Sequence, residues 1–141
     1  MKKFLLYLFL IICLFGCKES LNKKEESQYN PIEINGVSVD IYDISLTGAT
    51  IIIKDINEEP NVYSEWYKIE KEENGIWYEV ETLVNNYGFN EIGYLVDENN
   101  EVKFVINWEK LYGKLSHGSY RILKQVNNNY ICVEFDIAST S

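Results

Sequence analysis

The sequence has few residues of several types, and each shortage argues against a class of protein. Two prolines and eight glycines in 141 residues exclude collagen-like chains and linker-type sequences. One histidine and three cysteines leave little material for a zinc site or a catalytic triad. Thirteen basic residues against 22 acidic ones give a formal charge of −9, which argues against binding nucleic-acid phosphates. We therefore expect no metal, no cofactor, no catalytic residues and no nucleic-acid partner.

What is present is the composition of an ordinary globular protein. Hydrophobic residues make up 46 % of the chain and aromatic residues 14 %, with eleven tyrosines and three tryptophans. A chain of this length suffices for one domain rather than two.

The first seventeen residues have the layout of a secretory signal. Lys2 and Lys3 precede an apolar run over residues 4–15, which is too short to span a bilayer comfortably, since that needs about 20 residues. The tail Leu14-Phe15-Gly16-Cys17 resembles the bacterial lipobox, although Phe15 is larger than the residue usually found at its position. The resemblance implies that the Cys17 thiol receives a diacylglyceryl group and that cleavage follows Gly16. The alternative is a plain N-terminal anchor with an incidental cysteine.

Either interpretation places the domain on the extracytoplasmic face of a cell membrane, and a diacyl anchor suffices for stable attachment. We divide the chain into a lipoprotein signal peptide (1–16), a lipidated cysteine with a polar tether (17–31) and a folded domain (32–138). Residues 18–31 contain one leucine and no apolar periodicity, so we predict a flexible tether. Cleavage removes Lys2 and Lys3 and leaves 125 residues with a net charge of −11, which favours a cationic partner or a divalent ion over an anion.

From residue 32 onward, short alternating runs broken by turn residues predict an all-β sandwich. Glu73-Asn74-Gly75 and Asn127-Asn128-Asn129 are typical of hairpin turns. Residues 83–100 are the least regular part, with a short strand expected at 92–96, and residues 108–115 have room for one short helical turn. We predict seven main strands, at 37–41, 50–56, 65–71, 76–81, 102–108, 120–125 and 130–137.

Two blocks of sequence carry a family resemblance. The first combines Tyr67-Lys68-Ile69-Glu70-Lys71 with Gly75-Ile76-Trp77, and the second runs from Trp108 to Lys124. The second block reads W..LYG.L..G.YRI.K, and it resembles a bacterial immunoglobulin-like domain family common in low-GC bacteria. The resemblance covers residues 37–137 and implies an immunoglobulin-like antiparallel β-sandwich of about seven strands on the outside of the cell. It supplies neither an enzymatic activity nor a shared ligand.

The second block also contains a pattern similar to the tyrosine corner of sandwich domains, in Leu115, Gly118 and Tyr120. In that motif the tyrosine at the start of the penultimate strand bonds through its hydroxyl to backbone a few residues upstream. We therefore interpret these residues as specifying the fold rather than as catalytic.

Aromatic residues on one predicted hairpin form the candidate binding surface. Trp66 shares its parity with Lys68 and Glu70, and Trp77 alternates with Glu79, so both rings are expected on the solvated face of the hairpin, with Tyr78 beside them. They would form a platform for a protein partner or for sugar stacking. The alternative, which we favour, is cross-strand packing beneath long Lys and Glu side chains.

The remaining candidates are interpreted as structural. His117, the only histidine, is expected in a surface loop, and Cys132 as a half-buried thiol pointing away from the Ile131 and Phe135 side chains. Calcium binding by the acidic loops at 55–59 and 97–101 is the one alternative left open to the expectation of no metal, although neither loop matches the twelve-residue calcium-loop pattern.

We expect a membrane-anchored lipoprotein with a non-catalytic interaction domain, whose partner is a protein rather than a glycan. The alternatives are a small extracytoplasmic enzyme, which would require His117 or a carboxylate pair to line a pocket, and a spacer without a ligand.

Overall fold

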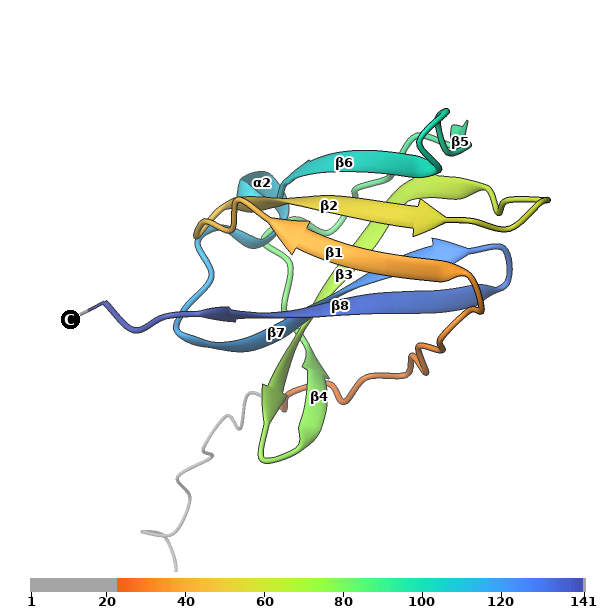
Figure 1. Ribbon diagram of the computed structural model, residues 1–141. Coiled ribbons are helices and arrows are strands. Elements are labelled where there is room, and N and C mark those ends of the chain that lie inside the picture. Colours follow the sequence, from red (N-terminus) through yellow and green to blue (C-terminus); the bar gives the residue numbers. More distant parts are fainter. Residues whose placement is uncertain (1–22, 141) are drawn as a thin grey trace, which may run out of the picture.

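The computed structural model describes residues 23–140, so Cys17 and the predicted signal peptide lie outside the described residues. Within the described range the chain forms two antiparallel β-sheets that pack face to face (Figure 1). One sheet has the order β1-β2-β6, and the other has the order β4-β3-β7-β8 with the short β5 also paired to β3. No helix among the described residues is long and apolar enough to cross a membrane.

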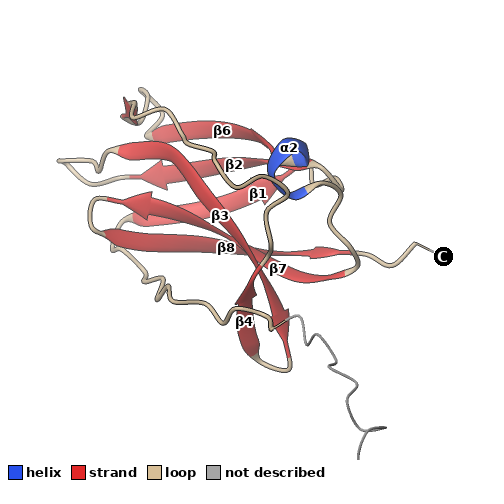
Figure 2. Cartoon of the chain, turned by 180° about the vertical axis from the view of Figure 1, so that it is seen from behind, coloured by secondary structure: helices blue, strands red, loops and turns tan. Residues whose placement is uncertain are grey.

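The seven predicted strands are all present, with ends shifted by no more than two residues. The eighth, β5, falls within the short strand expected at 92–96, and the helical turn expected in 108–115 is α2. The loop that joins β4 to β5 passes beside α2 (Figure 2), where the Leu83 amide donates to the Leu111 carbonyl at 2.7 Å. The elements are β1 (Val37–Tyr42), β2 (Gly48–Asp55), β3 (Tyr63–Glu73), β4 (Ile76–Glu79), β5 (Gly93–Tyr94), β6 (Glu101–Asn107), α2 (Glu109–Tyr112), β7 (Gly118–Val126) and β8 (Asn129–Ile137).

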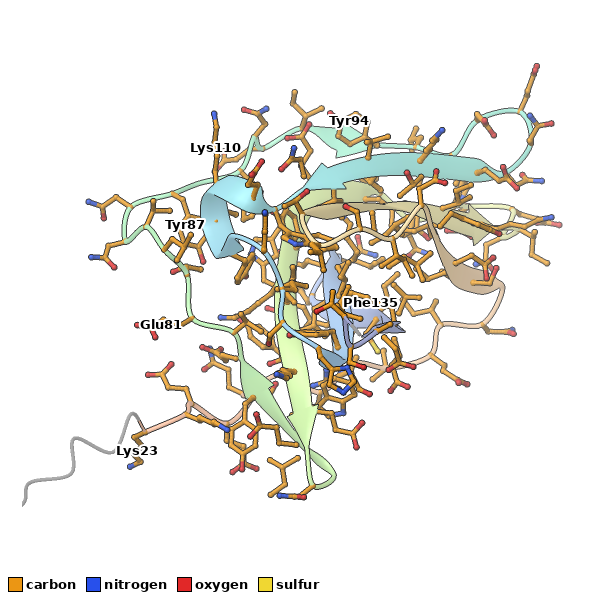
Figure 3. The ribbon with its side chains drawn as sticks, turned by 90° about the vertical axis from the view of Figure 1, so that its left-hand side faces the viewer. Lys23, Glu81, Tyr87, Tyr94, Lys110 and Phe135 are labelled. Atoms are coloured by element: carbon orange, nitrogen blue, oxygen red, sulfur yellow. The ribbon has the colours of Figure 1, made fainter. Side chains whose placement is uncertain are left out.

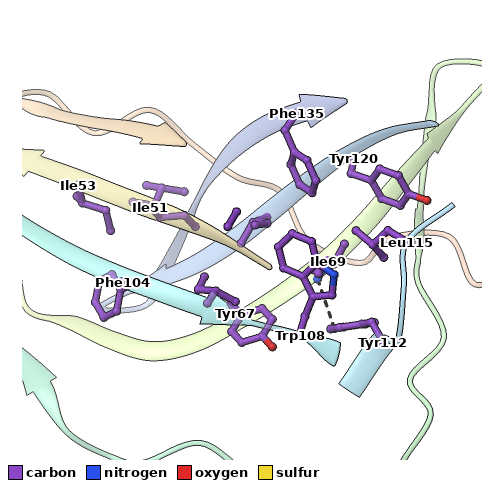
Figure 4. Close-up of a cluster of buried hydrophobic side chains, with 14 of the residues drawn as sticks. Ile51, Ile53, Tyr67, Ile69, Phe104, Trp108, Tyr112, Leu115, Tyr120 and Phe135 are labelled. Carbon is purple, nitrogen blue, oxygen red and sulfur yellow. Dashed lines mark hydrogen bonds between the residues drawn. The ribbon is translucent and has the colours of Figure 1, made fainter. Parts of the chain in front are cut away.

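The core is built from alternate residues of both sheets, as expected for strands that each bury one face. Ile51, Ile69 and Ile122 are fully buried, and Trp108 fills the space beside α2 (Figure 4). The Trp108 indole N–H donates to the Leu46 carbonyl at 2.9 Å, so the largest core side chain has its polar atom satisfied.

The predicted tyrosine corner is confirmed. The Tyr120 hydroxyl, near the start of β7, donates to the Ser116 carbonyl four residues upstream at 2.7 Å. The ring itself is buried and stacks against Phe135, with 5.6 Å between their centroids and 22° between their planes. The corner thus fixes the chain that connects α2 to β7.

Part of the predicted tether is not free. Glu26 forms an isolated β-bridge with Tyr78, the Ser27 amide donates to the Trp77 carbonyl at 2.9 Å, and the Glu79 amide donates to the Glu25 carbonyl at 2.8 Å. Further along, the Ile32 amide donates to the Tyr130 carbonyl of β8 at 2.8 Å. Residues 24–32, called the docked segment below, therefore run from one edge strand of the larger sheet to the other (Figure 1).

The physical reason for this difference is that the segment docks mainly through its backbone. Edge strands present unpaired N–H and C=O groups that any extended chain can satisfy. Such pairing needs no apolar periodicity. The polar sequence of this segment therefore carries no pattern that would have predicted its docking. The predicted flexible tether is therefore corrected for residues 24–31.

Asp55 at the end of β2 organises the turn that leads into β3. Its carboxylate is fully buried and accepts hydrogen bonds from the Asn57 and Asn61 backbone amides and side chains and from the Tyr63 hydroxyl, at 2.8–3.1 Å. Burial by itself would raise the pKa of Asp55, but the hydrogen bonds from Asn61, Tyr63 and Asn57 outweigh it and hold the pKa well below its usual value.

This arrangement predicts how stability depends on pH. Because the folded-state pKa of Asp55 is depressed, its contribution is fully present above the unfolded-state pKa of about 4 and is lost as the pH falls below that value. We expect Asp55→Asn to lower the free energy of unfolding by about 3 kcal/mol at pH 7 and to weaken the acid dependence. Urea denaturation at pH 7, 5 and 3.5 measures both effects, with the exposed Asp40→Asn as the control. An equal loss for the two variants at pH 7 would contradict the assigned role.

Candidate functional site

The candidate site arises because β3 is longer than the strands that face it. β3 has eleven residues, whereas β2 has eight and β6 has seven. The end of β3 and its hairpin partner β4 therefore project past the smaller sheet (Figure 1). Side chains on the inner side of this projection, such as Lys71 and Tyr78, have no opposing strand to pack against.

A groove of about 730 Å³ occupies this position, which is within the size range of ligand clefts, roughly 300–1,000 Å³. Its walls come from the start of the docked segment, from β3 and β4, from the loop at 80–87, and from α2 with the residues that follow it. Lys23, Glu81 and Tyr87 lie along the same side of the molecule (Figure 3). Four tyrosines contribute to the lining, namely Tyr78, Tyr87, Tyr112 and Tyr120.

The charge of the groove differs from that of the rest of the domain. Five of the ten basic residues in the described range line it, together with only four of the 21 acidic ones. The remaining described surface and core thus hold five basic residues against seventeen acidic ones. The lining lysines are Lys23, Lys24, Lys68, Lys71 and Lys114, and the lining acids are Glu25, Glu73, Glu79 and Glu81.

Two of these lysines are neutralised locally. Lys68 forms an ion pair with Glu79 at 2.8 Å, and Lys24 pairs with Glu73. Burial by itself would lower the pKa of Lys68, but the bond to Glu79 outweighs it, so the pKa is raised and the ammonium stays charged.

Lys23, Lys71 and Lys114 form no ion pair with any residue from 23 to 140. The Lys71 ammonium instead donates to the Ser116 hydroxyl at 3.1 Å and lies 5.5 Å from the centre of the Tyr120 ring. A ligand with negative groups therefore has cations available to it in this groove.

The structure divides the predicted aromatic surface between two faces. Tyr78 lines the groove, whereas Trp66 and Trp77 lie on the outer face of the larger sheet. Trp66 packs between Tyr29 of the docked segment and Tyr130, with ring centroids 5.9 and 5.5 Å away. The three residues therefore do not form one continuous platform.

Trp77 covers a buried ion pair that sequence reasoning missed. The Arg121 guanidinium lies 4.5 Å from the Trp77 ring and pairs with Glu70 at 2.7 Å, and both charged side chains are at least 92 % buried. Arg121 also donates to the Ser27 hydroxyl at 3.4 Å. The docked segment thus closes over polar groups that the face of the sheet would otherwise expose.

The other predicted candidates have local structural contacts. His117 does not line the groove, and its Nδ1 lies 3.0 Å from the Ile137 carbonyl. Cys132 is free and half-buried, and burial raises the pKa of its thiol, which disfavours the reactive thiolate. The Asp97 carboxylate accepts the Asn99 and Glu101 amides within its own turn. Between residues 23 and 140 no group of three or more His, Cys, Asp or Glu side chains could hold a metal ion.

Residues 33–136 match a family model described as a bacterial Ig-like domain. The chain belongs to this family. The bacterial Ig-like domain explains the topology, because β1-β2-β6 and β3-β7-β8 occupy the places of strands A-B-E and C-F-G, with the tyrosine corner at the start of strand F. No curated protein and no solved structure matches the chain.

Membership confirms the family and the fold expected from the second sequence block. A bacterial Ig-like domain suggests an interaction or structural module rather than a catalyst. Function must still be argued from a site on this fold, since the fold alone does not specify one.

Proposed function

We propose that this protein is a lipid-anchored, extracytoplasmic lipoprotein whose bacterial Ig-like domain is a non-catalytic interaction module, and that its protein partner binds in the groove beside β4. The observation that carries the binding role is the groove itself, in which three lysines without an ion-pair partner in the described range meet four tyrosines. Tyrosines beside polar groups are typical of protein-binding surfaces, because one end of the ring is apolar and the other forms hydrogen bonds.

The proposed anchor and the groove lie close together along the chain. Lys23, which lines the groove, follows Cys17 by six residues, and six residues span at most about 20 Å. Lipidation at Cys17 would therefore hold the groove near the membrane surface. Such an anchor would also raise the effective concentration of the domain toward membrane-bound partners.

A protein is favoured over a glycan because the groove presents both signs of charge and several hydroxyl groups. Glu25 and Glu81 stand among its lysines, and Ser116 and Thr82 add hydroxyls. A polypeptide supplies backbone donors, backbone acceptors and charged side chains together, whereas a neutral sugar would leave the charged groups desolvated without partners.

The anchor is tested by Cys17→Ala in the native host. We expect the variant to be released into the medium or to accumulate as an unprocessed precursor, because only the thiol can accept the diacylglyceryl group. Membrane fractionation and mass spectrometry of the mature N-terminus measure this, with Cys132→Ala as the matched cysteine control. A Cys17→Ala protein that stays processed and membrane-bound would contradict the lipid anchor.

The binding role is tested by site-specific photo-crosslinking in intact cells. We expect a photoreactive amino acid at Tyr87, on the groove, to give one discrete protein adduct, and the same amino acid at the exposed Val105 on the opposite sheet to give none. The adduct should disappear when Lys71→Glu and Lys114→Glu are introduced. Equal labelling from both positions, or none from either, would contradict a groove-bound protein partner and would favour a spacer.

A further inference from the structure

We infer that the groove binds a carboxylate-rich segment of a partner polypeptide, with Lys71 and Lys114 as the residues that recognise its carboxylates. This inference rests on the proposed function and adds the chemical class of the bound segment. It runs against the charge of the whole chain, which favours a cationic partner, because the groove reverses that charge locally.

Lys71 is held in place before any ligand arrives. Its side chain passes over Gly118, where an added Cβ would lie 2.6 Å from the Lys71 Cε, so a larger residue would displace it. The Ser116 hydroxyl accepts one of its three ammonium donors at 3.1 Å. The two remaining donors are therefore available to a carboxylate, and the entropy cost of ordering this side chain is already met by the fold.

Lys114 is placed on the same groove by the turn that ends α2. Gly113 has φ of +69°, a left-handed conformation that redirects the chain immediately after the helix. Leu115 is then buried in the core, which fixes the backbone on the other side of Lys114. Two cations from distant parts of the sequence are thus presented on one groove by rigid neighbours.

The acids of the groove select a polypeptide over a uniform polyanion. Glu25 and Glu81 line the groove and form no ion pair with the described residues. A chain with a negative charge on every unit would be repelled by these carboxylates, whereas a peptide offers them backbone N–H donors between its own acidic side chains. Tyr78 and Tyr87 add aromatic surface for the aliphatic parts of such a segment.

The test uses the full chain in detergent micelles and two fluorescein-labelled ten-residue peptides, one of alternating Glu and Ser and one of alternating Gln and Ser. We expect the Glu peptide to bind at least about tenfold more tightly than the Gln peptide by fluorescence anisotropy, and its affinity to fall as salt is added. Lys71→Gln combined with Lys114→Gln should lower the affinity for the Glu peptide about tenfold. Lys54→Gln combined with Lys103→Gln makes the same charge change on the opposite sheet. This control should alter the affinity for the Glu peptide less than about twofold.

Thermal denaturation confirms that both double variants are folded before their affinities are compared. Equal affinity for the two peptides, equal effects of the two double variants, or no binding of the Glu peptide would overturn the inference. Binding of sodium polygalacturonate in place of the Glu peptide would overturn it in favour of an anionic glycan. A Tyr87 adduct in cells together with any of these results would mean that the chemical class is wrong. Absence of an adduct from Tyr87 in the chain that keeps Lys71 and Lys114 would mean that the proposed function itself is wrong.

Discussion

The architecture depends on one mismatch of length between the two sheets. β3 continues past the ends of β2 and β6, so the last part of the β3–β4 hairpin has no opposing sheet. Each face of a strand that leaves a core must be covered by something else or be exposed to water. In this domain the docked segment covers the outer face, and the inner face becomes one wall of a groove with charged residues and tyrosines.

The docked segment and the groove therefore depend on each other. Lys24 and Glu25 line the groove, and the next residues pair with β4, so detaching the segment would remove a wall of the groove. It would also hydrate the Glu70–Arg121 pair. A buried ion pair adds little net stability over an apolar pair of similar volume. Once buried, however, it is destabilising unless the groups that cover and hydrogen-bond it stay in place. The pair thus favours one position for the docked segment over many.

The fold was largely predictable because its signals are local. Alternating residues in 102–108 and 130–137 mark strands regardless of what they pair with, and the Leu115, Gly118 and Tyr120 spacing marks the corner. The family followed from the same block. The docked segment was missed because its pairing with β4 and β8 is made by backbone atoms. Its side-chain contacts, such as Lys24 with Glu73 and Tyr29 with Trp66, leave no apolar pattern in residues 24–31.

The groove could not be predicted, because it is assembled from residues that are far apart in the chain. Lys71 and Lys114 are 43 positions apart, and only the overhang of β3 brings them to one side. The candidate binding surface combined Trp77 with Tyr78 because they are adjacent in the chain. Adjacent residues of a strand, however, point to opposite faces of the sheet. The burial of Arg121 could not be predicted from the sequence, because an arginine in a strand is usually exposed.

The most direct test is amide hydrogen exchange of the full chain in micelles, measured by NMR. If the docked segment covers the overhang, the Ser27 and Glu79 amides, which donate across it, should exchange at least about tenfold more slowly than in an unfolded peptide. The Lys23 amide, which precedes the segment, supplies the unprotected reference. A Ser27 amide that exchanges as fast as in an unfolded peptide would contradict the docking, and with it the shape of the groove.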